Sequence, residues 1–165
     1  MIAVSNTTPL RYLIAIEQEQ LFSGVFEKVF VPSAVHEELT KMATPERVRN
    51  VIRSLPSWYE VREVQSSPLV PLPATLHRGE RQAILLAEVM KPDFLLIDER
   101  VGRTIALERN LPVSGTLGVL ERADTLGLVN DFPGLLSKLK TSGFFISANL
   151  EHEVFLRYRR RHPAR

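Results

Sequence analysis

The chain has 165 residues, 44% of them hydrophobic and 24% charged, which is typical of one globular domain. It contains no cysteine, which excludes disulfide bonds and thiolate zinc sites and fits a reducing compartment. Because no apolar run approaches the roughly 20 residues that span a bilayer and the N-terminus lacks signal-peptide features, we expect a soluble cytoplasmic protein without a membrane partner.

The first half of the chain predicts three strands and four helices. Strands are expected at 2–5, at 28–32 and, as an edge strand, at 58–64. A helix should begin at Pro9 with Thr8 as its N-cap, and another should cover 33–42 with Ser33 as its cap. Shorter helices are expected at 21–26 and 45–55. Residues 65–77 contain three prolines and no periodicity, and therefore predict a loop.

The second half alternates strands with helices. Strands are expected at 94–97 and 112–114, and helices at 79–90, 99–110, 117–126, 132–140 and 150–160. This alternation is typical of βαβ units, so we predict an α/β fold with a parallel sheet between layers of helices. No linker divides the chain, and we expect one domain at 1–150 followed by a C-terminal helix and basic tail at 151–165.

The charge is concentrated in that tail. Five arginines against two glutamates give residues 151–165 a charge of +3, so the rest of the chain carries −1 of the total of +2. Arginines beside Tyr158 suit contacts with phosphates and bases. The alternative is a solvated helix end that aids solubility.

Two polar side chains follow predicted strands. Asn6 comes after the first strand, and Asp98 ends the apolar run of 94–97. Ligands of open parallel sheets bind at the carboxyl ends of the strands, so the two side chains should face one crevice if their strands are neighbours.

Two further carboxylates fall on apolar helix faces. Glu38 shares a face with Val35, Leu39 and Met42, and Glu80 shares one with Ala83, Ile84 and Ala87. A buried carboxylate is costly unless it is paired or coordinates a cation, so we predict that the two glutamates join Asn6 and Asp98 in one site.

Each residue also has a structural interpretation. Asp98 would cap the following helix, Glu38 would pair with Lys41, and Asn6 would form an Asx turn. Glu80 would complement its helix dipole, although His77 should prevent a capping box. The joint occurrence of the four residues favours a shared site.

Oxygen ligands without histidine or cysteine favour Mg²⁺ or Mn²⁺. Such an ion activates water and stabilises charge on a phosphate under attack. A receiver-like phosphoacceptor role for Asp98 is less favoured, because it needs a lysine on a late strand end and "LPVSG" has none.

The chain resembles the PIN domain family from residue 2 to about residue 126. The segments that carry the resemblance are "VSNTTPL", "VFVPSAVHEEL", "GERQAI", "LLIDERVGRTIA" and "LPVSGTLGVL". The closest similarity is to a PIN-like subfamily with extra C-terminal helices. The resemblance implies a PIN-like three-layer α/β sandwich and a metal-dependent ribonuclease, many members being toxins of toxin–antitoxin pairs.

The family's acidic quartet falls on Asn6, Glu38, Glu80 and Asp98, of which Glu38, Glu80 and Asp98 would hold Mg²⁺ or Mn²⁺. We expect RNA as substrate, with contacts from Thr7, Arg103, Arg159 and Arg160, and a small antitoxin protein or a second copy of the chain as further partners. For Arg103, the alternative is a surface pair with Glu99.

Asn6 departs from the family pattern, in which the first acid is aspartate. An amide removes one negative charge beside the ion, and one unit pair at ~4 Å is worth roughly 4 kcal/mol at an effective dielectric constant near 20. Glu99 or Thr7 would have to compensate. The competing hypothesis is therefore a catalytically weak or inactive PIN-like protein that binds nucleic acid or a partner.

Overall fold

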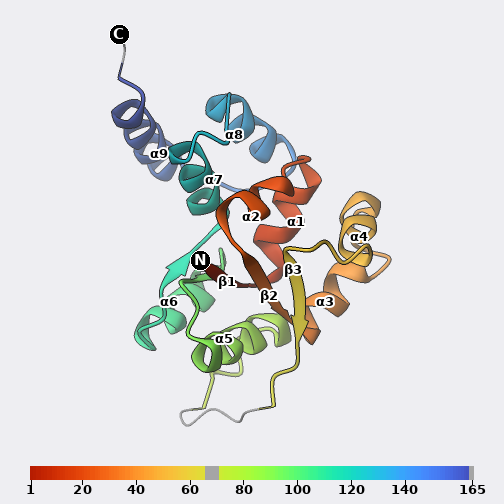
Figure 1. The fold of residues 1–165 in the computed structure, drawn as a ribbon. Helices are drawn as coiled ribbons and strands as arrows, with labels where there is room; N and C mark the ends of the chain where they lie inside the picture. The colour runs from red at the N-terminus through yellow and green to blue at the C-terminus, as the bar shows by residue number, and fades with distance from the viewer. Residues whose placement is uncertain (66–70, 164–165) are drawn as a thin grey trace.

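The protein is described here by a computed structural model that covers residues 1–65 and 71–163. A parallel sheet lies at the centre of this described part (Figure 1). Its five strands have the order β3–β2–β1–β4–β5. The strands are β1 (Ile2–Ser5), β2 (Lys28–Pro32), β3 (Tyr59–Arg62), β4 (Phe94–Leu96) and β5 (Val113–Ser114). Each predicted strand is thus confirmed to within two residues, and β3 lies at the sheet edge as expected.

Helices cover both faces of the sheet, which confirms the three-layer α/β sandwich. One face carries α5 (Arg78–Met90) and α6 (Arg100–Glu108). Helices on the other side are α1 (Thr7–Ala15), α2 (Gln20–Val25), α3 (Ser33–Thr40), α4 (Glu46–Arg53), α7 (Thr116–Thr125), α8 (Phe132–Thr141) and α9 (Ala148–Arg161). Within the described ranges, no helix combines the length and apolarity needed to cross a membrane.

Alternating side chains of the central strands build the two cores. Ala3 and Leu96 point to the core shared with α1, α2 and α7, whereas Val4, Leu95 and Ile97 point to the core beneath α5 and α6. All five are fully buried. A parallel sheet covered on both faces requires such continuous apolar runs, which explains why the segment at 94–97 is apolar throughout.

Two predicted helix caps are wrong for the same reason. The first helix begins at Thr7 with Asn6 as N-cap, so Pro9 is its third residue and Thr8 does not cap it. Ser33 is the first residue of α3, and the extended residue before it, Pro32, occupies the cap position. In both places the strand leads into the helix after at most one residue, so the last extended residue becomes the cap.

Side chains of the C-terminal helix fix it to the main body. Val154 is fully buried in the larger core. Nε of Arg157 lies 2.8 Å from Glu121, and Nε of Arg161 lies 2.8 Å from the buried carboxylate of Asp124, both on α7. The predicted loop at 65–77 falls partly on residues 66–70, which lie outside the described residues; its described remainder contains no helix or strand.

Candidate functional site

Strand β1 positions Asn6 beside the carboxyl end of β4. The two strands are paired in parallel, and the backbone N–H of Asn6 donates to the carbonyl of Leu96 at 2.9 Å. Asn6 therefore lies with Asp98 at the carboxyl ends of neighbouring strands, as the sequence predicted, and it also lies beside Glu99. Its side chain is buried, and Nδ2 donates to Oε2 of Glu99 at 3.0 Å.

Glu38 reaches the same region from α3. Its Oε2 accepts a hydrogen bond of 2.9 Å from the hydroxyl of Thr7. A Cβ placed on Gly79 would lie 3.3 Å from this oxygen and 3.4 Å from Oδ1 of Asn6. Glu38 and Asn6 therefore direct oxygens toward one point, and a glycine at the start of α5 leaves room between them.

The prediction that Glu38 lies on a buried helix face is wrong. Glu38 is exposed, and the buried side chains of α3 are Ala34, Val35 and Leu39. The helix ends at Thr40, so Met42 lies beyond it and is 80% exposed. Glu38 stands at the rim of the apolar stripe, where its carboxylate stays within reach of both water and Thr7.

Glu80 is buried as predicted, at the first turn of α5 and only 6% exposed. Its Oε2 accepts the backbone N–H of His77 at 2.9 Å, while Oε1 lies 3.2 Å from the position of a Cβ on Gly102. Glu80 thus forms one of the two hydrogen bonds of a capping box, to the backbone of the cap residue, while the His77 side chain does not cap the helix, as its residue type predicted.

Asp98 is bound on both oxygens by Thr116, at the start of α7. The Thr116 N–H donates to Oδ1 at 2.9 Å, and the hydroxyl donates to Oδ2 at 2.6 Å. Burial raises the pKa of Asp98 to about 6, against the lowering effects of the Thr116 hydrogen bonds and the nearby Arg103. Asp98 does not cap α6, whose N-cap position is occupied by Glu99.

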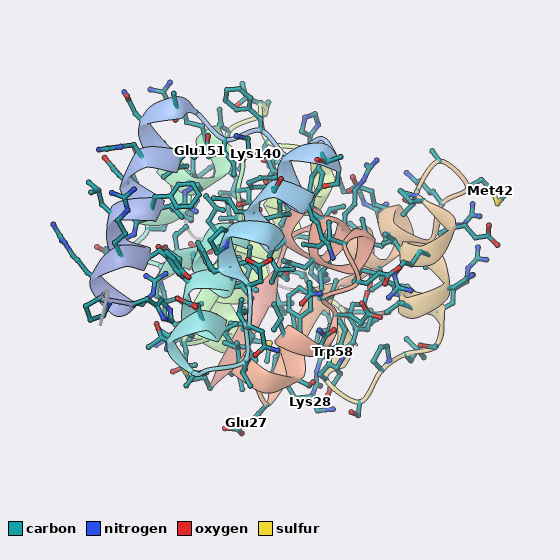
Figure 2. The ribbon with its side chains drawn as sticks, turned by 90° about the horizontal axis from the view of Figure 1, so that it is seen from above. Glu27, Lys28, Met42, Trp58, Lys140 and Glu151 are labelled. Carbon is teal, nitrogen blue, oxygen red and sulfur yellow. The ribbon has the colours of Figure 1, made fainter. Side chains whose placement is uncertain are left out.

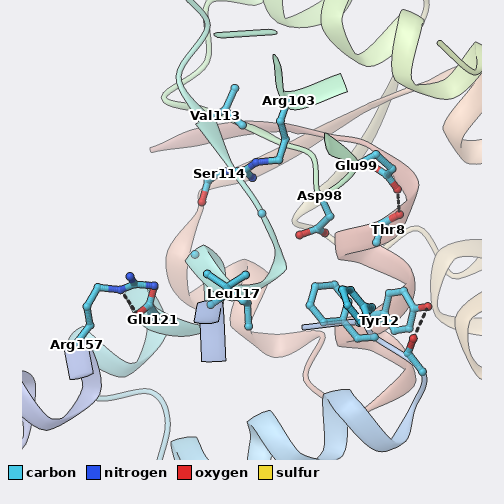
Figure 3. Close-up of a pocket in the computed structure, with 16 residues that line it drawn as sticks. Thr8, Tyr12, Asp98, Glu99, Arg103, Val113, Ser114, Leu117, Glu121 and Arg157 are labelled. Carbon is cyan, nitrogen blue, oxygen red and sulfur yellow. Dashed lines mark hydrogen bonds and ion pairs between the residues drawn. The ribbon is translucent and has the colours of Figure 1, made fainter. Parts of the chain in front are cut away.

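Glu99, and not Asp98, is the acid that contacts Asn6. It accepts a hydrogen bond from Asn6 Nδ2. It also accepts one from the Thr8 hydroxyl (Figure 3). Consecutive side chains at the end of an extended segment point to different sides. The sequence signal for the role of Glu99 was its position next to Asp98, since either of these two acids could have faced Asn6.

The predicted substrate-binding residues divide into two groups. Thr7 is bound to Glu38. Arg103 Nη1 donates to the carbonyl of Ile97 at 2.8 Å, beside Asp98, so the alternative of a surface pair with Glu99 is wrong. Arg159 and Arg160 are exposed on the last turn of α9 and do not line the cavity beside the acids.

That cavity measures about 790 Å³ and lies between the carboxyl ends of the strands and the C-terminal helices. Asp98, Glu99 and Arg103 form one part of its wall, and Tyr12 and Leu117 form another (Figure 3). Arg157 also lines it, held by Glu121. The cavity thus joins the acidic site to an aromatic and apolar wall.

Comparisons with known proteins identify the family and the fold. A family model described as a PIN domain matches residues 2–159, and the chain belongs to the PIN domain family. This is a nuclease-type family whose members generally depend on a divalent metal, and it suggests nucleic-acid binding. No curated protein matches the sequence of the chain.

A solved structure supports the fold. The chain is similar to a PilT N-terminus domain protein from the hyperthermophilic archaeon Sulfolobus solfataricus P2, with a TM-score of 0.53 and 14% sequence identity. The similarity covers 79% of this chain and 98% of that one. At this identity the comparison shows the shared fold alone.

The donor set fits the hard divalent ion that the family implies, because the amide oxygen of Asn6 and the carboxylates are all oxygen ligands. Among the described residues, however, no three histidine, cysteine, aspartate or glutamate side chains are gathered as a metal-binding group. Thr7, His77 and Asn6 donate hydrogen bonds to Glu38, Glu80 and Glu99 respectively. Ion binding would require these carboxylates to exchange such donors for the metal.

Proposed function

We propose that the chain is a Mg²⁺- or Mn²⁺-dependent phosphodiesterase that hydrolyses RNA. The convergence of Asn6 and Glu38 carries the proposal, because their oxygens lie 3.4 and 3.3 Å from one point at Gly79, directly before the buried Glu80. Three segments that are far apart in the sequence thus bring oxygen ligands together at the carboxyl ends of the strands. Structural roles alone do not require such an arrangement.

Each of these residues would have a separate role. Glu38 and Glu80 would hold the metal, and Asn6 would supply a neutral oxygen or orient the attacking water. Asp98 stays a candidate ligand, but we assign the strand-end position to Glu99 because Glu99 contacts Asn6 directly. When bound, the ion would activate water and stabilise negative charge on the phosphate.

Arg103 would hold the substrate. Its guanidinium lies beside Asp98 at the cavity wall, where a phosphate could accept hydrogen bonds from it. The arginines at 159 and 160 would add sequence-independent attraction for the RNA backbone, which weakens as salt concentration rises.

A second function is favoured by Asn6. Its amide places a neutral hydrogen-bond donor 3.0 Å from Glu99, so this pair is stable without a cation. The chain would then bind RNA or a protein partner at the same site without cleaving it. Family membership also supports a role as the toxin of a toxin–antitoxin pair, in which a small antitoxin protein would bind the chain.

A ribonuclease assay in Mn²⁺ separates the two functions. Glu80→Gln is the central variant, because glutamine keeps an oxygen for the His77 N–H but removes the charge. If the chain is an enzyme, the wild type should cleave RNA, Glu80→Gln should not, and a chelator should abolish cleavage. Glu46→Gln, at an exposed glutamate on α4, is the matched control and should behave as the wild type.

Asn6→Asp decides the binding alternative. An inert wild type together with an Asn6→Asp variant that cleaves would show that the scaffold is competent and that Asn6 has removed activity. The toxin role predicts that expression of the wild type, but not of Glu80→Gln, slows growth of the host cell. Equal growth with both proteins would contradict it.

A further inference from the structure

Phe145 is the most exposed large hydrophobic side chain in the described part of the protein. It is 84% exposed, whereas each of the other seven phenylalanines is buried or partly buried. It lies in the connection between α8 and α9, and it lines the same cavity as Asp98 and Glu99. Its aromatic face is thus available beside the acidic site.

The connection around Phe145 is anchored on both sides. Gly143 has φ of +99°, a conformation that favours glycine and that turns the chain at the end of α8. The next residue, Phe144, packs edge-to-face on Tyr12 with ring centroids 5.2 Å apart. Ile146, on the other side, is buried in the main core. An ordered turn therefore presents Phe145 to solvent.

The cavity offers different chemistry at its two ends. Asp98, Glu99 and Arg103 provide charged groups at the sheet edge, and Tyr12 forms the wall below them in Figure 3. Its volume of about 790 Å³ lies within the range of about 300–1,000 Å³ that is usual for ligand sites. This pattern suits a ligand with a phosphate at one end and a flat ring at the other.

We propose that Phe145 is a stacking platform for an unpaired base of RNA whose backbone lies at the acidic site. The inference rests on the proposed function for its choice of RNA as the ligand. A base in a duplex has both faces covered by its neighbours, so an aromatic platform selects single strands. Stacking on an aromatic ring tolerates any base, because every base has a π-face. Arg103, in the charged wall beside Asp98, supplies a cation for the adjoining phosphate.

Binding of a fluorescein-labelled oligouridine, measured by anisotropy in EDTA, tests the platform without requiring cleavage. Phe145→Ala should weaken binding about tenfold, which lies within the range that base–aromatic stacking contributes per base. Phe145→Trp should restore the wild-type affinity. An oligomer of ribose phosphate without bases should bind the wild type and Phe145→Ala equally, because it has nothing to stack.

Met42→Ala is the matched control. Met42 is 80% exposed and lies at one end of the molecule, well away from Lys140 and Glu151, which flank the connection that carries Phe145 (Figure 2). Its replacement should leave the affinity for oligouridine unchanged. Circular dichroism should show that the Phe145 variants keep the helical content of the wild type.

The outcomes separate this inference from the proposed function. Equal affinity of the wild type and Phe145→Ala for oligouridine, equal weakening for both polymers, or no binding by the wild type would overturn the platform. The aromatic face would then be left to a protein partner. Loss of affinity in Phe145→Ala from a chain that does not cleave RNA in Mn²⁺ would support the platform and contradict the nuclease.

Discussion

The substitution Asn6→Asp should destabilise the metal-free protein and make its stability depend on a divalent ion. In the wild type, Nδ2 of Asn6 donates to Glu99 at 3.0 Å. Aspartate would place a second carboxylate there, and two unit charges at this distance repel by about 5 kcal/mol at an effective dielectric constant near 20. Uptake of a proton by the pair reduces the penalty, and we expect a net loss of about 2 to 4 kcal/mol in the free energy of unfolding.

Urea unfolding at neutral pH measures this loss, first in EDTA and then in Mn²⁺. An ion that binds only the folded state stabilises it by about 2.7 kcal/mol at a concentration 100 times its dissociation constant. Mn²⁺ should therefore recover most of the stability of Asn6→Asp and should stabilise the wild type less. Asn6→Ala is the control, because it removes the hydrogen bond without adding charge and should gain less from Mn²⁺ than Asn6→Asp.

One result would refute the reasoning. If Asn6→Asp unfolds at the same urea concentration as the wild type in EDTA, and Mn²⁺ shifts both proteins equally, the side chain at position 6 does not face Glu99. The arrangement of the site at this sheet edge would then be incorrect, and the case for a metal there would be lost with it.

Three further predictions concern the surrounding structure. Burial raises the pKa of Asp98 from 3.8 to about 6, so the folded protein binds this proton more tightly than the unfolded chain does. The resulting stability, up to about 3 kcal/mol, should be present below about pH 4 and should be lost as the pH rises through about 6. The variant Asp98→Asn should flatten this part of the pH profile of urea unfolding. Gly115→Ala would place a Cβ 2.5 Å from Oδ1 of Asp98, and should lower the free energy of unfolding by about 1 to 3 kcal/mol, measured by thermal denaturation. Val154→Ala leaves a cavity beneath α9, and should cost about 2 kcal/mol while it raises the rate of amide hydrogen exchange in that helix.

Each of these has a contradicting outcome. Stability that rises between pH 4 and pH 6 with a slope that Asp98→Asn removes would reverse the sign assigned to this carboxyl. Unchanged melting of Gly115→Ala would mean that Asp98 is not held against the start of α7. Exchange in α9 that Val154→Ala leaves unaltered would show that this helix does not depend on the core for its order.

The sequence predicted the elements of the fold because their signals are local. Continuous apolar runs such as 94–97 predict strands covered on both faces, and the spacing of apolar residues predicts most helices to within two residues of their ends. The edge position of β3 followed from the alternation within 58–64. The polar residues that follow two of these strands likewise indicated a shared site, because ligands of open parallel sheets bind at the carboxyl ends of the strands.

The direction of each side chain was decided by the tertiary structure. Asp98 and Glu99 are adjacent in the sequence, yet Asp98 is held by Thr116 from α7 and Glu99 by Asn6 from β1. Strand order brings β1 beside β4, and this pairing depends on contacts across the whole chain that no local pattern encodes. The same holds for Phe145, whose place beside the acids exists only because the C-terminal helices fold back over the sheet edge. Residue types and local periodicity thus determined which groups the protein possesses, while long-range packing determined which of them meet.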